Sequence, residues 1–319
     1  MLYKHNKTAA ALLGATLLFA GCGSDDNDTT TQENGDGAVQ KEVTIDFRAM
    51  MGNESVACSE NNQTKVYTNV GTSDESVTIK DFRFFVSEVK FIKADGTKVP
   101  LTLTNNDNQY QKENGDHVAI LDFEDNTGDC IDRGNTPETY TTLIGTIPDD
   151  TYSDIEFTLG VPFDINHDST SYADIKALNQ PMMSWSWQAG RKFTKIELHS
   201  QTDPSLVWNF HLGSTGCVAT TDTNSTVVTE SCAQPNRIQV RLQEFNPQTN
   251  AIKVNYKSLL RNNDVAIDLG MSKGCMSGLT DPECDALFTG LALDVANQTG
   301  TCINGGDCSS QTLFMKITK

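Results

Sequence analysis

Residues 77–92 read VTIKDFRFFVSEVKFI, and this stretch favours one or two extended segments. The tripeptide Ala-Asp-Gly at 94–96 follows as a turn signal, and the apolar residues Val99, Leu101 and Leu103 come directly after it. Two extended segments joined by such a turn predict a β-hairpin.

Further strand signals lie on both sides of this hairpin. Val43, Ile45 and Phe47 alternate with polar neighbours, as a strand with one buried face requires. The other predicted strands are 118–123, 155–161, 193–198, 207–212, 238–242, 252–256 and 313–317. Polar pieces rich in Gly, Asn and Asp, such as 105–115 and 220–231, are predicted as loops. In the last third, only 282–297 has helical character.

Many short strands separated by turn signals indicate a mainly β fold. We expect an antiparallel β-sandwich with long disulfide-tied loops and one short helix. Its roughly 280 residues exceed the usual domain size, but sandwiches with long loops reach that length as one unit. Because no internal repeat or linker interrupts it, 41–319 is predicted to be a single β-rich domain.

The composition restricts the classes of partner. The chain has 319 residues, 37% of them hydrophobic, which is enough to bury a core. Its net charge of −18 repels phosphate backbones, so we expect no nucleic-acid partner. Beyond residue 21, no apolar run approaches the roughly 20 residues that span a bilayer, so we expect the body of the protein to be soluble.

The N-terminus has the pattern of an export signal. Lys4, His5 and Lys7 precede the apolar stretch 8–20, which is too short to anchor as a helix. Small residues then precede Cys22, and this resembles the site at which bacterial lipoproteins are cleaved and acylated. An ordinary signal followed by a chance cysteine is the alternative.

We therefore predict a lipoprotein signal peptide at 1–21 and lipidation of Cys22. Residues 22–40 would form a lipidated, acidic, disordered tether, because 23–40 contain five acidic residues, no basic residue and no large apolar residue before Val39. The protein would be anchored to a bacterial envelope membrane, in the periplasm or at the cell surface, with the lipid as its only membrane contact.

Eight further cysteines form an even set, and an oxidising compartment favours disulfides. The sequence alone allows 105 connectivities for eight cysteines. Three pairs are suggested by short separations along the chain, and the two cysteines that remain form the fourth pair. Because none of the cysteines has CxxC spacing, a structural role is favoured over a zinc or redox site. The suggested pairs are Cys217 with Cys232, Cys275 with Cys284, Cys302 with Cys308, and Cys58 with Cys130.

Common catalytic signatures are absent from the sequence: it contains no GxSxG, GxxxxGK or HExxH motif. We therefore predict a protein that is not an enzyme. Histidine, the usual copper or zinc ligand, is scarce after export. The remaining histidines are His117, His167, His199 and His211.

Two of these histidines have distinctive neighbours. His211 follows a predicted strand and precedes a Gly-rich turn that ends at Cys217, while His167 lies where another strand passes into a loop. Trp185 and Trp187 lie between them and share one face if the chain is extended. Core packing or a sugar-stacking platform is the alternative role for the tryptophans.

Two acidic stretches raise the question of calcium. Asp164, Asn166 and Asp168 have the spacing that begins a calcium loop, but Ser169 and Ile175 occupy positions that need Gly and Glu. Turn formation by these side chains is favoured. A solvated loop is favoured over a cation or partner site for a second acidic group, which comprises Asp122, Glu124, Asp125 and Asp129.

Six motifs, in order from about Phe47 to Leu293, together resemble the MbnP-like family of exported copper-binding proteins, also described as the four-Cys member of a metallo-mystery pair. The motifs are FRFFVS at 82–87, LDFED at 121–125, FTLGVPF at 157–163, WSW at 185–187, HLGSTGC at 211–217, and GCMSG at 274–278 with DPEC at 281–284.

The resemblance implies a β-rich exported protein whose partner is an MbnH-type, MauG-like di-haem peroxidase. That peroxidase would oxidise Trp185 or Trp187 to kynurenine, and His167 and His211 would bind copper. Arg191 departs from the pattern, because the family usually has an aromatic residue there. The tail with Cys302 and Cys308 and the long loop before Cys232 also lie outside the pattern.

From the sequence we therefore expect first a copper-binding lipoprotein that is not an enzyme and that serves copper acquisition, storage or delivery. The alternative is a surface recognition module that binds sugar or peptide through exposed tryptophans, with calcium in its acidic loops. A metal-dependent hydrolase ranks lowest, because no set of metal, general base and open coordination position is visible.

Overall fold

A computed structural model describes residues 39–319 except 133, 168–173, 187–188, 222–226 and 304. The predicted signal peptide and Cys22 lie outside the described residues, as do Trp187 and Asp168. The first strand begins at Gln40, at the end of the predicted tether. Among the described residues, no helix is long and apolar enough to cross a membrane.

The described strands form two large sheets, and six of them make up the first. Its members are β1 (Gln40–Met51), β2 (Glu54–Ser55), β8 (Thr102–Leu103), β11 (Thr142–Pro148), β20 (Asn250–Asn255) and β22 (Phe314–Thr318). The order is β22, β20, β1, β11, β8, with β2 beside β1. β1 is antiparallel to β11 and parallel to β20. As the alternation predicts, Val43, Ile45 and Phe47 are buried.

The second sheet is built around one long strand, β6 (Glu75–Ile92), which contains the whole predicted 77–92 stretch. The other main-path strands are β19 (Ile238–Leu242), β12 (Asp154–Leu159), β15 (Thr194–Ser200), β16 (Val207–Phe210) and β21 (Gly274–Cys275). The order is β19, β12, β6, β15, β16, β21. Four strands pair off this path: β5 (Val66–Val70), β7 (Lys98–Pro100), β9 (Gln109–Gln111) and β10 (His117–Asp122).

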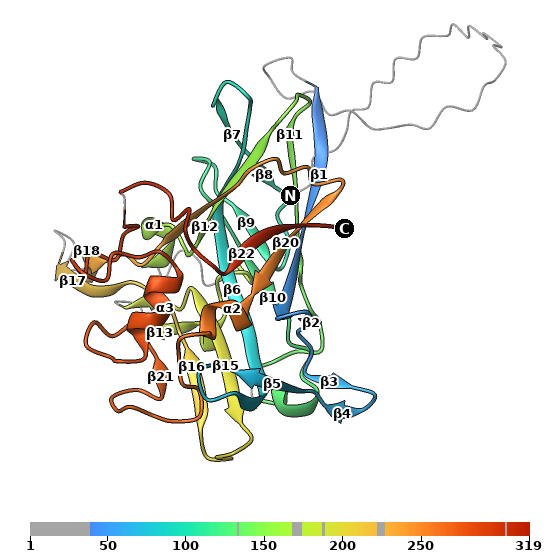
Figure 1. The fold of residues 1–319 in the computed structure, drawn as a ribbon. Helices are drawn as coiled ribbons and strands as arrows, with labels where there is room; N and C mark the ends of the chain where they lie inside the picture. Colours follow the sequence, from blue (N-terminus) through green and yellow to red (C-terminus); the bar gives the residue numbers. More distant parts are fainter. Residues whose placement is uncertain (1–38, 133, 168–173, 187–188, 222–226, 304) are drawn as a thin grey trace, which may run out of the picture.

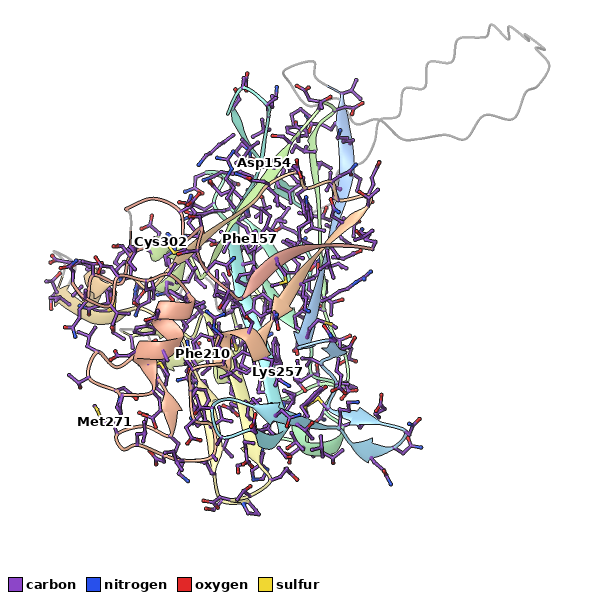
Figure 2. All side chains as sticks on the ribbon, in the orientation of Figure 1. Asp154, Phe157, Phe210, Lys257, Met271 and Cys302 are labelled. Carbon is purple, nitrogen blue, oxygen red and sulfur yellow. A yellow bond between two sulfur atoms is a disulfide. The ribbon has the colours of Figure 1, made fainter. Side chains whose placement is uncertain are left out.

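The two sheets pack through aromatic side chains, as a sandwich requires. The ring centroids of Phe84 on β6 and Phe314 on β22 lie 6.0 Å apart. Phe157 on β12 is 5.1 Å from Phe314 and 5.8 Å from Phe47 on β1. Side chains fill the region around Phe157 in Figure 2, where the sheets of Figure 1 come together. The structure confirms the predicted mainly β fold.

Short elements decorate the sandwich. Three small hairpins are β3–β4 (Ser59–Glu60, Gln63–Thr64), β13–β14 (Ser184–Ser186, Gly190–Arg191) and β17–β18 (Thr215–Thr221, Val227–Gln234). The α-helices are α1 (Phe163–Asn166), α2 (Tyr256–Leu260) and α3 (Cys284–Gly290), and the 3-10 helices are η1 (Gly128–Cys130) and η2 (Pro181–Met183). Figure 1 shows α3 on the same side of the molecule as the β17–β18 hairpin.

Several local expectations were inexact. The predicted helical stretch 282–297 contains the seven-residue α3, but the described chain also has two shorter α-helices. The predicted loop 220–231 overlaps the β17–β18 hairpin, because polar Thr and Ser residues can pair in a ladder that faces solvent. β7 forms the predicted hairpin with β6, whereas β8 joins the first sheet through β11.

The disulfides match the pairs suggested by sequence separation. They join Cys58 to Cys130, Cys217 to Cys232, Cys275 to Cys284, and Cys302 to Cys308. The Cys217–Cys232 bond crosses β17 and β18 and is half-buried, while the sulfur-bearing residues of the others are buried.

Candidate metal centre

The backbone holds His211 firmly at the end of β16. Its N–H donates to the carbonyl of Cys275 at 2.9 Å, and its carbonyl accepts from the Ser277 hydroxyl at 3.0 Å. The same hydroxyl oxygen accepts from the N–H of Gly213 at 3.0 Å. Cys275 at the end of β21 and Ser277 just after it therefore fix both the histidine and the turn that follows it.

The side chain of His211 is 3% exposed and contacts a carboxylate through one nitrogen. Its Nε2 lies 2.9 Å from Oε1 of Glu197 on β15. Because an ionised carboxylate only accepts hydrogen bonds, Nε2 carries the proton and Nδ1 carries the lone pair. Among the described residues, Nδ1 is buried without a hydrogen-bond partner. A carboxylate on one imidazole nitrogen and a free lone pair on the other is the usual arrangement of a metal-binding histidine.

The electrostatics keep this imidazole neutral. Burial lowers the pKa of His211 more than the hydrogen bond to Glu197 raises it. Burial by itself raises the pKa of Glu197. The hydrogen bond from His211 and the charge of Lys195 lower this pKa by more, so its net value is about 2. At neutral pH the pair is therefore a carboxylate and a neutral imidazole, which is the form that a metal requires.

A buried ionic network holds Glu197 in place. Lys195 lies 3.1 Å from Glu197 and also pairs with Asp81, which in turn binds Arg83. The register of β15 against β6 places Lys195 opposite Arg83 and Glu197 opposite Asp81. These charged side chains therefore share one face of the sheet, while Phe82 and its neighbours on the opposite face belong to the core.

Trp185 lies next to the turn that follows His211. It belongs to β13 and is half-buried, and a Cβ atom on Gly213 would collide with its six-membered ring. A glycine is therefore needed at position 213 for the ring to pack there. Trp185 also lines a cavity of about 360 Å³ with Cys217 and Met276.

His167 lies at the C-terminal end of α1 and is half-buried. Its ring centroid is 4.7 Å from that of Phe163. The Asn166 amide nitrogen is 3.1 Å from His167 Nε2, so it donates to a nitrogen that carries a lone pair. The same Nε2 lies 3.3 Å from Sγ of Cys232. The Cys217–Cys232 disulfide thus contacts His167 and borders the cavity of Trp185.

His167, Cys217 and Cys232 have ligand atoms within 4.8 Å of one another. The two sulfurs are joined in a disulfide and supply no thiolate, so we assign no metal to this trio. The proximity of His167 to His211 stays a prediction, whereas the contact between Trp185 and Gly213 places one predicted tryptophan against a residue two positions after His211.

Arg191, the departure from the family pattern, links these segments. Its guanidinium is buried and donates through one nitrogen to the carbonyls of Ile165 at 2.6 Å and Asn166 at 3.0 Å. Its backbone N–H donates to the Asn166 side-chain oxygen at 2.7 Å. Arg191 therefore ties the hairpin of Trp185 to the helix that ends at His167.

The other histidines have separate roles. His117 is buried, and its Nε2 accepts the N–H of Val89 at 2.6 Å. His199 lies 3.0 Å from Asp129 through Nδ1. The first bond joins β10 to β6, and the second joins η1 to β15.

The second acidic group, which the sequence interpretation assigned to a solvated loop, is not exposed: Glu124 is buried, while Asp122, Asp125 and Asp129 are half-buried. Two of its carboxylates cap turns instead. Asp125 accepts from the N–H and hydroxyl of Thr127, and Glu124 accepts from the N–H of Asn126. Asn166, the middle residue of the calcium-like spacing, forms hydrogen bonds with Arg191 and His167.

The sequence interpretation missed Glu197 as a residue of the site. Lys195 and Glu197 alternate with apolar residues on a predicted strand, and this alternation indicates a charged face.

The architecture defines a disulfide-stapled β-sandwich protein with a candidate metal centre where β16 meets the β13–β14 and β17–β18 hairpins. The family model for MbnP matches residues 40–277, so the chain belongs to the MbnP family. The structure is similar to that of MbnP from Methylosinus trichosporium, with a TM-score of 0.72 and 28% sequence identity. This match covers 88% of the present chain and 99% of the other.

A comparison with curated proteins finds no match. The family predicted from the motifs is thus confirmed, and the matched region ends before Cys284, Cys302 and Cys308.

Proposed function

We propose that this protein binds copper without catalysing a reaction and serves copper acquisition, storage or delivery in the bacterial envelope. Membership of the MbnP family supports a copper-associated function. The observation that carries the proposal is the buried, unpartnered Nδ1 of His211 in the described structure, whose ring is oriented by Glu197 on the other nitrogen.

The donor set suits copper. Imidazole binds both copper oxidation states, and His211 is neutral at physiological pH. The eight cysteines of the described chain are joined in disulfides, so thiolates do not compete with the histidines. His167 is the second proposed ligand. The lone pair on its Nε2 accepts from the Asn166 amide, and copper bound at that nitrogen would replace this hydrogen bond.

Trp185 is the preferred site of oxidation by a di-haem peroxidase, because its ring packs on Gly213 beside His211. Trp187, the second candidate, lies outside the described residues. One tryptophan and two hydrogen peroxide molecules would give kynurenine, formate and water. Kynurenine has an aniline nitrogen that donates a lone pair to metals, whereas the indole N–H of tryptophan only donates a hydrogen bond. Oxidation would therefore add a copper ligand.

Recognition of a sugar or peptide by exposed tryptophans is less well supported. Trp185 is half-buried against Gly213, and Trp208 is fully buried. Stacking platforms need an accessible ring face. We therefore retain copper binding as the function.

The decisive experiment is a Cu(I) competition titration of protein co-expressed with its peroxidase partner. His211→Ala should abolish tight binding, while the matched variant His199→Ala should retain it, because His199 bonds to Asp129 instead. Peptide mass spectrometry should find the loss of one carbon and gain of one oxygen at Trp185. Equal copper binding by the two variants would refute the assignment.

The anchoring proposal rests on the residues before Cys22 and the acidic stretch after it. Metabolic labelling with a fatty acid should mark the wild-type protein, and Cys22→Ser should remain unlabelled. A wild-type protein that carries no label and begins elsewhere would refute this part alone.

A further inference from the structure

One carboxylate oxygen of Glu197 has two donors in the interior of the protein. Oε1 of Glu197 lies 2.9 Å from Nε2 of His211 and 3.1 Å from Nζ of Lys195. Only 3% of the Lys195 side chain and 10% of the Glu197 side chain are exposed. The ammonium of Lys195 and the ring N–H of His211 therefore share a single acceptor that is largely shielded from water.

Two neighbouring strands hold the ammonium of Lys195 in this position. Lys195 precedes Glu197 by two residues on β15, so their side chains lie on the same face of the strand. The same ammonium donates to Asp81 on β6, a fully buried carboxylate that also accepts from Arg83. Because carboxylates from both strands bind it, the ammonium is a fixed positive charge beside the pair of Glu197 and His211.

A cation in this position changes how strongly His211 donates electrons to a metal. A carboxylate that accepts from a metal-binding histidine raises the basicity of the ring. A cation bonded to the same carboxylate lowers its affinity for protons, so Glu197 pulls less on the Nε2 proton of His211. The ring then stays a moderate donor, and moderate donors favour the lower oxidation state of a metal. The charge of Lys195 also repels Cu(II) twice as strongly as Cu(I) at the same distance.

We propose that Lys195 sets the oxidation-state preference of the candidate metal centre, and that it favours Cu(I) over Cu(II) by sharing Oε1 of Glu197 with His211. The proposal rests on the copper function proposed above. Lys195 is a positioning residue, because it acts through Glu197 and not on the metal. Glu197 orients the ring of His211, while Lys195 limits how much electron density the carboxylate passes to that ring.

The test measures Cu(I) and Cu(II) binding by competition titration, with protein co-expressed with its peroxidase partner. In Lys195→Met, the preference for Cu(I) over Cu(II) should fall at least about tenfold, which lowers the Cu(II)/Cu(I) potential by about 59 mV or more. Lys195→Arg retains the charge and should stay near the wild-type preference. The matched control is Lys176→Met, which should change nothing, because the side chain of Lys176 is 71% exposed and pairs with Asp107 instead.

A second measurement needs no metal. Proton NMR of copper-free Lys195→Met should show the Nε2 proton of His211 shifted downfield from its wild-type position, because its hydrogen bond to Glu197 becomes stronger. The same spectrum shows whether the variant is folded.

An unchanged Cu(I) preference in Lys195→Met would overturn the proposal and leave copper binding intact, and so would an equal loss of preference in Lys195→Arg. Wild-type protein that binds Cu(II) at least as tightly as Cu(I) would overturn it without any variant. Wild-type protein that binds neither ion would refute the copper function itself, and the role of Lys195 with it.

Discussion

Nε2 of His211 lies 2.9 Å from Oε1 of Glu197, a residue 14 positions earlier on the neighbouring strand. This contact sets the tautomer of the imidazole, and it exists because β15 and β16 are adjacent in the second sheet. The carboxylate is itself held by Lys195 at 3.1 Å. A potential metal ligand is therefore oriented before any metal arrives, which reduces the cost of assembling the site.

Glu197→Gln should weaken copper binding about 10- to 100-fold, the usual effect of losing a carboxylate behind a ligating histidine. Glutamine keeps the shape of the side chain but loses the charge that favours an Nε2-protonated ring. Nitrogen NMR of the copper-free protein should show His211 leaving its single tautomer. The exposed Glu42 provides the control, and Glu42→Gln should change neither reading. An unchanged tautomer would contradict the role assigned to Glu197.

Arg191→Lys should lower the free energy of unfolding by about 1–3 kcal/mol, because buried carbonyls lose guanidinium donors. Lysine has one nitrogen where arginine presents a planar fork. Copper affinity should fall as well, since the bonds join the segments of His167 and Trp185. Chemical denaturation and copper titration measure both effects, with the exposed Arg261→Lys as control. Wild-type stability in Arg191→Lys would show that the guanidinium bonds contribute little.

Asp122 should make stability depend on pH. Burial raises its pKa to about 8, although the charge of Arg83 opposes this. The folded carboxyl therefore keeps a proton that the unfolded chain releases near pH 4. Its contribution to stability is full below about pH 4 and is lost as pH rises through about 8, with a slope of up to about 1.4 kcal/mol per unit.

Denaturant titrations between pH 5 and 8 measure this slope in wild type and in Asp122→Asn. The variant cannot ionise at this position, so its free energy of unfolding should lack the one-proton decline. Identical slopes in the two proteins would exclude Asp122 as the titrating group.

Replacing Cys217 and Cys232 by serine should lower the free energy of unfolding by about 3 kcal/mol, the loop-entropy value for a separation of 15 residues. The aromatic core between the two large sheets does not include this hairpin, so the circular dichroism should change little. Copper binding should weaken, because Cys232 contacts His167. A collapse of the β spectrum would show that the disulfide supports the whole sandwich.

Much of the fold was predictable because the order of apolar and polar residues within a strand shows which of its faces is buried. The alternation at Val43, Ile45 and Phe47 and the 77–92 stretch required extended chain with apolar faces, and both became central strands. Short separations between cysteines suggested the disulfides correctly, because nearby chain segments meet most readily. The six motifs also indicated the MbnP family, because each of them consists of one or two short runs of residues.

The candidate centre was only partly predictable. His211 was recognisable because histidine is scarce in this sequence and because a Gly-rich turn follows it. Its contact with Glu197, however, depends on the register of β15 against β16. The hydrogen bond from the Asn263 amide to the Glu283 carbonyl likewise joins residues 20 positions apart. Sequence patterns indicate which side chains of a segment are buried and which are exposed to water, and this is a local property. Which strand lies beside which, and in what register, is decided by packing between distant segments, and that packing alone placed a carboxylate behind His211.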